Sequence, residues 1–156
     1  MEVLLTIGED GVLKNAEFDD TAGLDVDPGF EDIVDIIQRT EVIIPNSVTK
    51  IGERAFFDKR WLLGVTIPGT VTSIGDEAFS DCYYMESITM PESVAVIGSR
   101  AFAYCEGLVS VTVMNETAEI AADAFFGCGQ DLIIFAKPGS SAEKYAAENS
   151  FGAELV

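Results

Sequence analysis

Apolar and polar positions along most of the chain recur with a fixed period of 23 residues. The Ala-Phe pairs show this best, because Phe56, Phe79, Phe102 and Phe125 follow one another at that spacing. Other residue types keep the same step; they are Pro45, Pro68 and Pro91, Gly52, Gly75 and Gly98, and Cys82, Cys105 and Cys128. So many matches at one spacing indicate an array of structural repeats.

One repeat has the pattern Val-x-Ile-Pro-x-x-Val-x-x-Ile-Gly-x-x-Ala-Phe-x-x-Cys-x-x-Leu, as in the residues from Val65 to Met85. A unit of this length cannot bury its own apolar side chains, so it has to stack on copies of itself and share one continuous core. The alternating segment Ile88-Thr89-Met90 predicts a short strand with Thr89 outward and its two neighbours inward. Strands of successive coils should pair in parallel, about 4.8 Å apart.

The remainder of each repeat is expected to return the chain to its starting side. We predict a turn at the Val-x-x-Ile-Gly segment, where glycine adopts a backbone shape that other residues resist. The Ala-Phe pair then points inward, so the four phenylalanines should form one buried stack. At the same spacing the three cysteines should stack as buried free thiols, and not as a metal cluster, a nucleophile or a set of disulfides.

This pattern resembles the BspA-like (bacterial surface protein A-like) leucine-rich-repeat family over about residues 42–150. The resemblance extends to residues 138–149, which are similar to the helical cap that closes arrays of this family; Ser140 and Glu143 suit a capping box there. We therefore expect a leucine-rich-repeat solenoid of right-handed coils. Its strands should form a parallel β-sheet, with a hairpin-plus-helix cap before the repeats and a helical cap after them.

The array departs from the pattern at both ends. Lys59 replaces cysteine in the first copy, and the fourth copy has Met114 for proline and Ala121 for glycine. One extra residue after Cys128 leaves the register of residues 133–135 open by one position. Because a slip of one residue exchanges the two faces of a strand, we assign no surface role there.

The first quarter of the chain does not repeat. Residues 1–41 carry 12 acidic and 2 basic residues. Their alternating segments predict a hairpin over Val3–Ile7 and Val12–Phe18, and Asp27 as cap before a proline predicts a helix to about Arg39. An N-terminal cap that covers the first coil accounts for both elements.

Three regions follow from these patterns; they are an acidic N-terminal cap at 1–41, the leucine-rich repeats at 42–137 and a C-terminal helical cap at 138–156. The acidic stretch between Asp19 and Asp32 leaves calcium binding open. However, Gly29 lies one position early for an EF-hand loop, and Ile36 occupies the place of its bidentate glutamate. A solvated acidic face is the simpler interpretation.

Charge and composition narrow the partners and the chemistry. The net charge of −18 repels phosphate backbones and anionic lipid, so we expect neither nucleic acid nor membrane as a partner. The absence of histidine removes the usual general base and the commonest metal ligand. We expect no enzyme, no catalytic residue, no metal site and no cofactor. A carboxylate-dependent glycosidase is the remote alternative, because it needs only two well-placed acids.

Solenoids bind through their aligned strands and the loops that enter them. Two rows of residues meet this description; they are Thr66, Thr89 and Thr112 on the strands, and Arg60, Trp61, Tyr83 and Tyr84 in the loops. Trp, Tyr and Arg are the types most enriched in binding hot spots. Solvent-facing threonine is also ordinary for a strand, and the rings of Trp61 and Tyr84 would equally suit a cover over the core, so both readings stay open.

The family resemblance implies a non-catalytic protein-interaction module. It implies a bacterial surface or secreted adhesin-type domain that binds host-surface or extracellular-matrix glycoproteins, and an extracellular or cell-surface location. Met1–Leu5 has neither a basic region nor a long apolar one, so no signal peptide is expected there. A structural spacer or accessory domain of a larger cell-envelope protein is the alternative.

Overall fold

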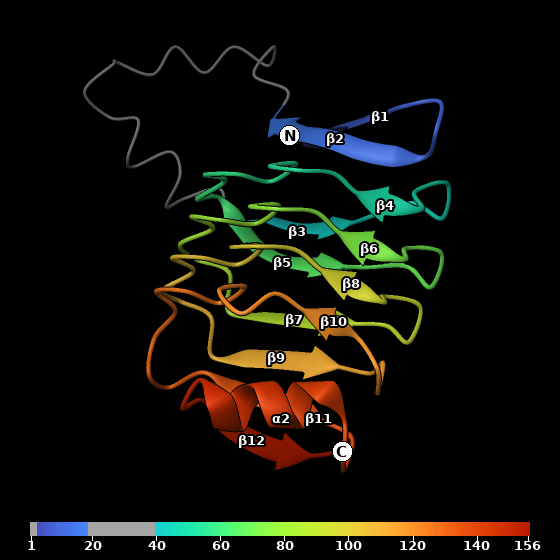
Figure 1. The fold of residues 1–156 in the computed structure, drawn as a ribbon. Coiled ribbons are helices and arrows are strands. Elements are labelled where there is room, and N and C mark those ends of the chain that lie inside the picture. Colours follow the sequence, from blue (N-terminus) through green and yellow to red (C-terminus); the bar gives the residue numbers. More distant parts are fainter. Residues whose placement is uncertain (1–2, 19–39) are drawn as a thin grey trace, which may run out of the picture.

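The chain folds into a stack of coils with a β-sheet on each of two opposite sides (Figure 1). A computed structural model describes residues 3–18 and 40–156. The helix predicted from Asp27 to Arg39, and the calcium alternative, lie outside these residues. Between the two sheets runs one continuous hydrophobic core, as expected for repeats that stack on their own copies.

The two sheets have six strands each. Sheet A consists of β1 (Val3–Ile7), β2 (Val12–Phe18), β4 (Lys50–Ile51), β6 (Ser73–Ile74), β8 (Val96–Ile97) and β10 (Glu119–Ile120). Sheet B consists of β3 (Thr40–Ile43), β5 (Leu62–Thr66), β7 (Ser87–Met90), β9 (Ser110–Val113), β11 (Ile133–Ala136) and β12 (Gly152–Leu155). One helix, α2 (Ser141–Glu148), lies between β11 and β12 along the chain.

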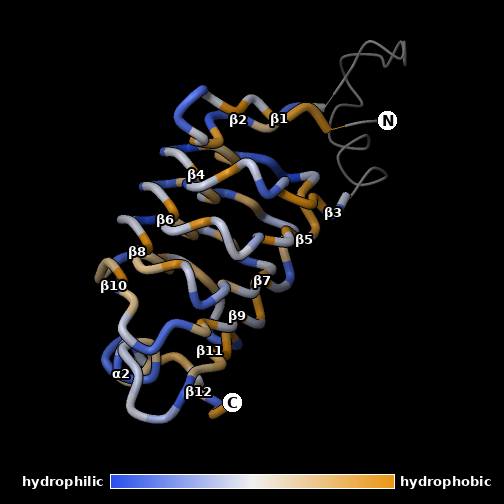
Figure 2. The backbone as a smooth tube through the Cα atoms, turned by 90° about the vertical axis from the view of Figure 1, so that its right-hand side faces the viewer, coloured by the Kyte–Doolittle hydropathy of each residue, from blue (hydrophilic) through white to orange (hydrophobic). Residues whose placement is uncertain are grey.

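Strand pairing follows the 23-residue period. β1 and β2 form the predicted antiparallel hairpin, and β2 then pairs in parallel with β4. All further pairs in both sheets are parallel. The predicted strand orientation is also confirmed, because Ile88 and Met90 are buried and Thr89 is exposed. Figure 2 shows the apolar positions of one coil above those of the next.

The predicted turn at Val-x-x-Ile-Gly is wrong. In each copy, the two residues before the glycine form a short strand that pairs with the equivalent strand of the next coil. These two-residue strands build most of sheet A. The prediction failed because a segment of two residues shows no alternation that distinguishes a strand from a turn.

The reason given for the repeat glycines is also wrong. Gly52, Gly75 and Gly98 do not have a positive φ; the left-handed residues follow two positions later, beginning with Arg54 at a φ of 56°. A Cβ on Gly75 would instead lie 2.7 Å from the backbone nitrogen of Glu53 in the previous coil. Glycine is needed there because the backbones of neighbouring coils approach closely.

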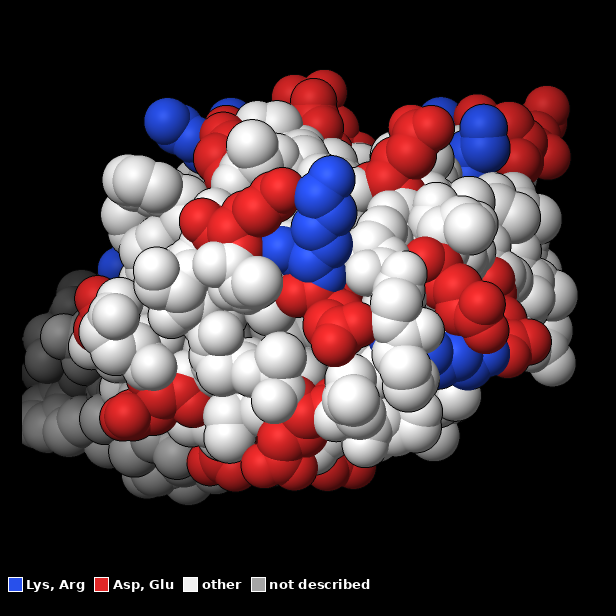
Figure 3. All heavy atoms as spheres, turned by 60° about the horizontal axis from the view of Figure 1, so that its bottom comes forward, with Lys and Arg blue, Asp and Glu red and all other residues white. Residues whose placement is uncertain are grey.

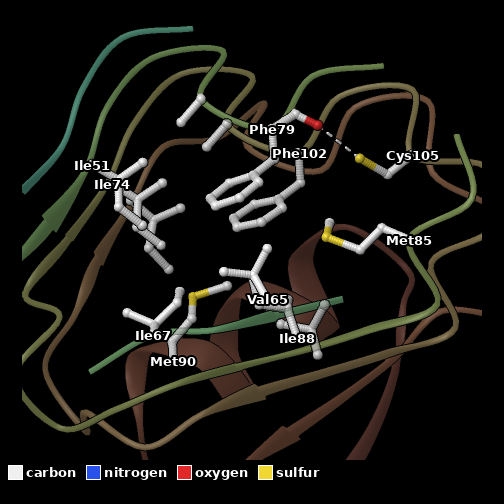
Figure 4. Close-up of a cluster of buried hydrophobic side chains, with 14 of the residues drawn as sticks. Ile51, Val65, Ile67, Ile74, Phe79, Met85, Ile88, Met90, Phe102 and Cys105 are labelled. Atoms are coloured by element: carbon white, nitrogen blue, oxygen red, sulfur yellow. Dashed lines mark hydrogen bonds between the residues drawn. The ribbon is translucent and has the colours of Figure 1, made fainter. Parts of the chain in front are cut away.

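The four phenylalanines form the predicted buried stack. Ring centroids are 4.8 Å apart for Phe56 and Phe79, 5.2 Å for Phe79 and Phe102, and 5.1 Å for Phe102 and Phe125. The rings are nearly parallel, with interplanar angles of 8°, 4° and 7°. Figure 4 shows two of these rings between the isoleucines of sheet A and the apolar side chains of sheet B.

The three cysteines are free and buried, as predicted. Each thiol donates a hydrogen bond to the carbonyl oxygen of the stacked phenylalanine of the preceding coil, for example Cys105 Sγ to Phe79 O at 3.0 Å (Figure 4). Burial raises the pKa of Cys82 and of Cys128 to about 12. These thiols therefore stay protonated at neutral pH and contribute packing and one hydrogen bond each.

The open register of the last repeat is resolved. Ile133 pairs with Ser110 and Ile134 with Val111, so β11 keeps the 23-residue step despite the extra residue before Leu132. Ile134 is fully buried, whereas Ile133 and Phe135 are half-buried on the other face. The insertion is compensated between Leu132 and the strand.

The C-terminal helix packs against the last coils, near β10, β11 and β12. Ser140 caps it, accepting a hydrogen bond from Glu143 N at 3.3 Å, and the Glu143 carboxylate accepts one from Gly139 N at 2.6 Å. The ring of Tyr145 lies edge-on to Phe125, with centroids 5.8 Å apart. After this helix the chain adds β12 beside β11, a strand that the sequence analysis did not predict.

Candidate functional site

The outward face of sheet B carries the threonines that the sequence singled out. Thr66 pairs with Thr89, and Thr89 pairs with Thr112, so the three form one row across adjacent parallel strands. Thr66 and Thr89 are exposed and Thr112 is half-buried. The row continues to Ile43 on β3, which is 76% exposed, and to Phe135 on β11.

A second outward row runs beside the first, two residues earlier in each strand. Gly64, Ser87 and Ser110 pair with one another across β5, β7 and β9. These small residues were not among the predicted site residues, although their place two positions before each threonine is a sufficient signal once the strands are aligned. The centre of the face therefore carries only glycine, serine and threonine.

A shallow depression of about 310 Å³ lies on this face over β3, β5 and β7. Its lining consists of Glu41, Gly64, Val65, Thr66, Ile67, Ser87, Ile88, Thr89 and Pro91. Two of the three predicted threonines thus lie at the depression, and Thr112 lies beyond it. The lining combines one carboxylate and several hydroxyl groups with strand backbone, which suits recognition of a polar or charged side chain.

The structure divides the predicted loop row into a buried residue and exposed ones. Trp61 is 7% exposed and belongs to the hydrophobic core, which favours the alternative that its indole covers that core. Tyr83 is 44% exposed, and its ring meets that of Tyr84 edge-on at 5.3 Å. The Glu106 carboxylate accepts a hydrogen bond from the Tyr83 hydroxyl and raises its pKa. Arg60 forms an exposed ion pair with Asp58 at 3.2 Å.

Two exposed aromatic residues near this loop row were missed. Tyr104 is 43% exposed and Phe126 52%, and their rings meet edge-on with centroids 5.6 Å apart. The guanidinium carbon of Arg100 lies 5.8 Å from the centre of the Phe126 ring. Tyr104 replaces the aspartates of the first two copies, and Phe126 shares its aromatic ring only with Phe57 of the first copy, so alignment of the four copies contains the signal.

Acidic side chains predominate on the surface. Figure 3 views the C-terminal end of the molecule, where carboxylates outnumber cationic groups. Lys137, directly after β11, lies between two carboxylates, with its ammonium nitrogen 2.8 Å from Glu92 and 3.4 Å from Glu116. This arrangement raises the pKa of Lys137 and lowers that of Glu92, chiefly through the hydrogen bond between them.

The described residues contain no cluster of three or more potential ligands that could hold a metal ion. Helices long and apolar enough to cross a membrane are likewise absent from residues 3–18 and 40–156.

Solved structures similar to this chain are bacterial leucine-rich-repeat proteins. A leucine-rich cell surface protein from Faecalibacterium prausnitzii has 24% sequence identity and a TM-score of 0.66 over 98% of this chain and 38% of its own. A leucine-rich-repeat protein from T. pallidum has 19% identity and a TM-score of 0.55 over 85% of this chain and 68% of its own. The chain thus spans well under half of the first protein's length. At these identities the likeness shows the fold.

No curated protein matches the chain. A family model described as "BspA type Leucine rich repeat region (6 copies)" matches residues 35–152, which is most of the chain. This range contains the phenylalanine stack, the cysteine ladder and both outward rows of sheet B. Sequence profile and fold therefore agree that the chain belongs to the BspA-type leucine-rich-repeat family.

Proposed function

We propose that this chain is a non-catalytic protein-interaction module of a bacterial surface or secreted protein, and that it binds its partner across the outward face of sheet B. The observation that carries the proposal is the pair of rows of small side chains, which leave a flat face with a depression over β3, β5 and β7. Parallel strands in a solenoid present such a face to a partner without any loop to obstruct it.

The proposal extends to the type of partner and to the ends of the array. An adhesin-type role toward host-surface or matrix proteins is supported by the family and by the neighbour described as a cell surface protein. We infer also that the hairpin before the repeats and the α2 region after them act as caps, since both extend the stack at its ends.

Retention of matrix and host-surface proteins on the immobilised chain tests the proposal. Thr89→Arg places a long cationic side chain in the centre of the face and should abolish retention. Val96→Arg is the matched control, because Val96 is an exposed β-branched residue on the outward face of sheet A. Equal retention by both variants would contradict binding through sheet B.

A structural spacer or accessory domain is the second candidate. It is favoured by one observation, that the chain spans only 38% of the F. prausnitzii protein it resembles. A spacer would retain no partner in this experiment and would be insensitive to either arginine variant. The same assay therefore separates the two functions.

A further inference from the structure

Gly64 lies within β5 at a position where neither a positive φ nor a close contact requires glycine. A Cβ added there would meet only the Glu41 side chain, at 3.8 Å, which is an ordinary van der Waals distance. Gly64 does not have a positive φ, although the strand has an irregularity beside it at Leu63. The contrast is with Gly75, where a Cβ would lie 2.7 Å from backbone.

The effect of Gly64 is to open the depression on sheet B. The same row carries Ser87 on β7 and Ser110 on β9, whose side chains project outward at the equivalent positions. Glycine inside a strand weakens the strand, and one of its common uses is to let a ligand approach the backbone. The missing side chain at Gly64 therefore indicates space for a ligand.

The chemistry of the lining indicates what enters this space. Glu41 supplies a carboxylate, and Thr66, Ser87 and Thr89 supply hydroxyl oxygens that accept hydrogen bonds. Val65 and Ile88 also border the depression, but their side chains point into the core, so its floor is the backbone of β5 and β7. An acceptor-rich rim suits a lysine or arginine side chain, whose methylene stem has room over the backbone at Gly64 while its charged end binds oxygen.

The charge of the face agrees with this occupant. None of the six strands of sheet B, all described in full, contains lysine or arginine. Lys137, at the end of β11, is already neutralised by two carboxylates. The chain as a whole has a net charge of −18, which attracts basic partners before contact.

We propose that the Gly64 depression is a subsite that receives a lysine or arginine side chain of the partner protein. The proposal rests on the proposed function and adds the chemistry that the partner must present. It also explains why glycine, which weakens a strand, occupies this one position of the row.

Short peptides test the subsite on the full 156-residue chain. The probes are blocked pentapeptides with lysine, arginine, glutamine or glutamate between pairs of glycines, titrated into ¹⁵N-labelled protein at physiological salt. We expect the amide signals of Thr66, Ser87 and Thr89 to shift with the two basic peptides. The basic peptides should bind about fivefold more tightly than the glutamine peptide, the size expected of one exposed ion pair.

Three variants make the test specific. Glu41→Gln should abolish the preference for basic peptides, and Gly64→Val should abolish binding because its side chain fills the depression. Ser110→Val places the same valine side chain in the same row outside the lining and should bind like the wild type. Binding by Gly64→Val, or signal shifts spread over all acidic surfaces, would overturn the subsite.

Failure of the subsite and failure of the proposed function remain distinguishable. Loss of partner retention with Thr89→Arg but not with Gly64→Val or Glu41→Gln would uphold the binding face and reject the subsite. Basic peptides that bind the depression of a chain that retains no protein partner would uphold the subsite chemistry and reject the interaction module.

Discussion

The interior of the coil stack and the outward face of sheet B follow the same 23-residue period, yet the period constrains their residues differently. In the interior the same ring recurs four times, from Phe56 to Phe125, and each is at most 1% exposed. On the outward face one row changes from Glu41 to Gly64 to Ser87. An interior side chain has to fit the ring above and below it, whereas an outward side chain meets only solvent or a partner. Departures from the repeat are therefore most informative on the face.

The largest expected difference between the two regions is at the phenylalanine stack. Phe79→Ala should lower the free energy of unfolding by about 3–5 kcal/mol, because it leaves a cavity between two coils that cannot close. Thr89→Ala, on the outward face, should change it by less than about 0.5 kcal/mol. Urea unfolding measures both. Similar losses for the two variants would contradict the division between interior and face.

The loop row tests where that division runs. Trp61→Ala should lower the free energy of unfolding by about 3 kcal/mol, since the indole is buried in the core. Tyr83→Ala, at an exposed ring, should leave stability nearly unchanged and weaken partner binding by about 2 kcal/mol if the ring is a hot spot. Melting and binding are measured on the same samples. A stable Trp61→Ala protein with impaired binding would return Trp61 to the binding site.

The two types of glycine sharpen the comparison with opposite signs. Gly75→Ala should destabilise the protein by about 1–3 kcal/mol, because its Cβ would press on the backbone of the preceding coil. Gly64→Ala should stabilise it by about 0.5–1 kcal/mol, because alanine restricts the unfolded chain and meets open space in the strand. Thermal unfolding of the two variants measures the signs. A destabilised Gly64→Ala would mean that the fold, and not a ligand, requires this glycine.

The buried thiols give an effect that is absent at neutral pH and appears only in alkaline solution. Burial raises the pKa of Cys82 from 9.0 to about 12, so unfolded chains ionise this thiol at a lower pH than the native protein does. The contribution of the protonated Cys82 thiol to the free energy of unfolding is complete below pH 9. It falls by about 1.4 kcal/mol per pH unit as the pH rises toward 12. Unfolding at pH 8 and pH 10 should therefore show a smaller pH dependence in Cys82→Ala than in the wild type.

Thiol labelling provides an independent check on the cysteines. A bulky reagent should modify Cys82, Cys105 and Cys128 slowly in the native protein and rapidly in urea, because all three are buried and protonated. Rapid labelling of the native protein at all three positions would show that the coils do not stack as described.

The sequence alone determined the interior of this protein. The period predicts the phenylalanine stack, the cysteine ladder and the alignment of Thr66, Thr89 and Thr112, because equal spacing along a solenoid places residues above one another. The hairpin of β1 and β2 was predictable as well, since alternation around a short loop is a local signal. These features depend only on a residue's own coil or on its copy in the next one.

Other features depend on the distance between neighbouring backbones or on the absence of a side chain. Only the tertiary structure decided these. The two-residue strands of sheet A have no pattern of their own, and Gly75 is required by the approach of a neighbouring coil. Trp61 and Tyr84 occupy equivalent repeat positions, yet packing buries Trp61 more deeply. Likewise, Gly64 becomes informative only when the structure shows that a side chain would fit there. Space between coils is a property of the assembled stack, so no single repeat contains it.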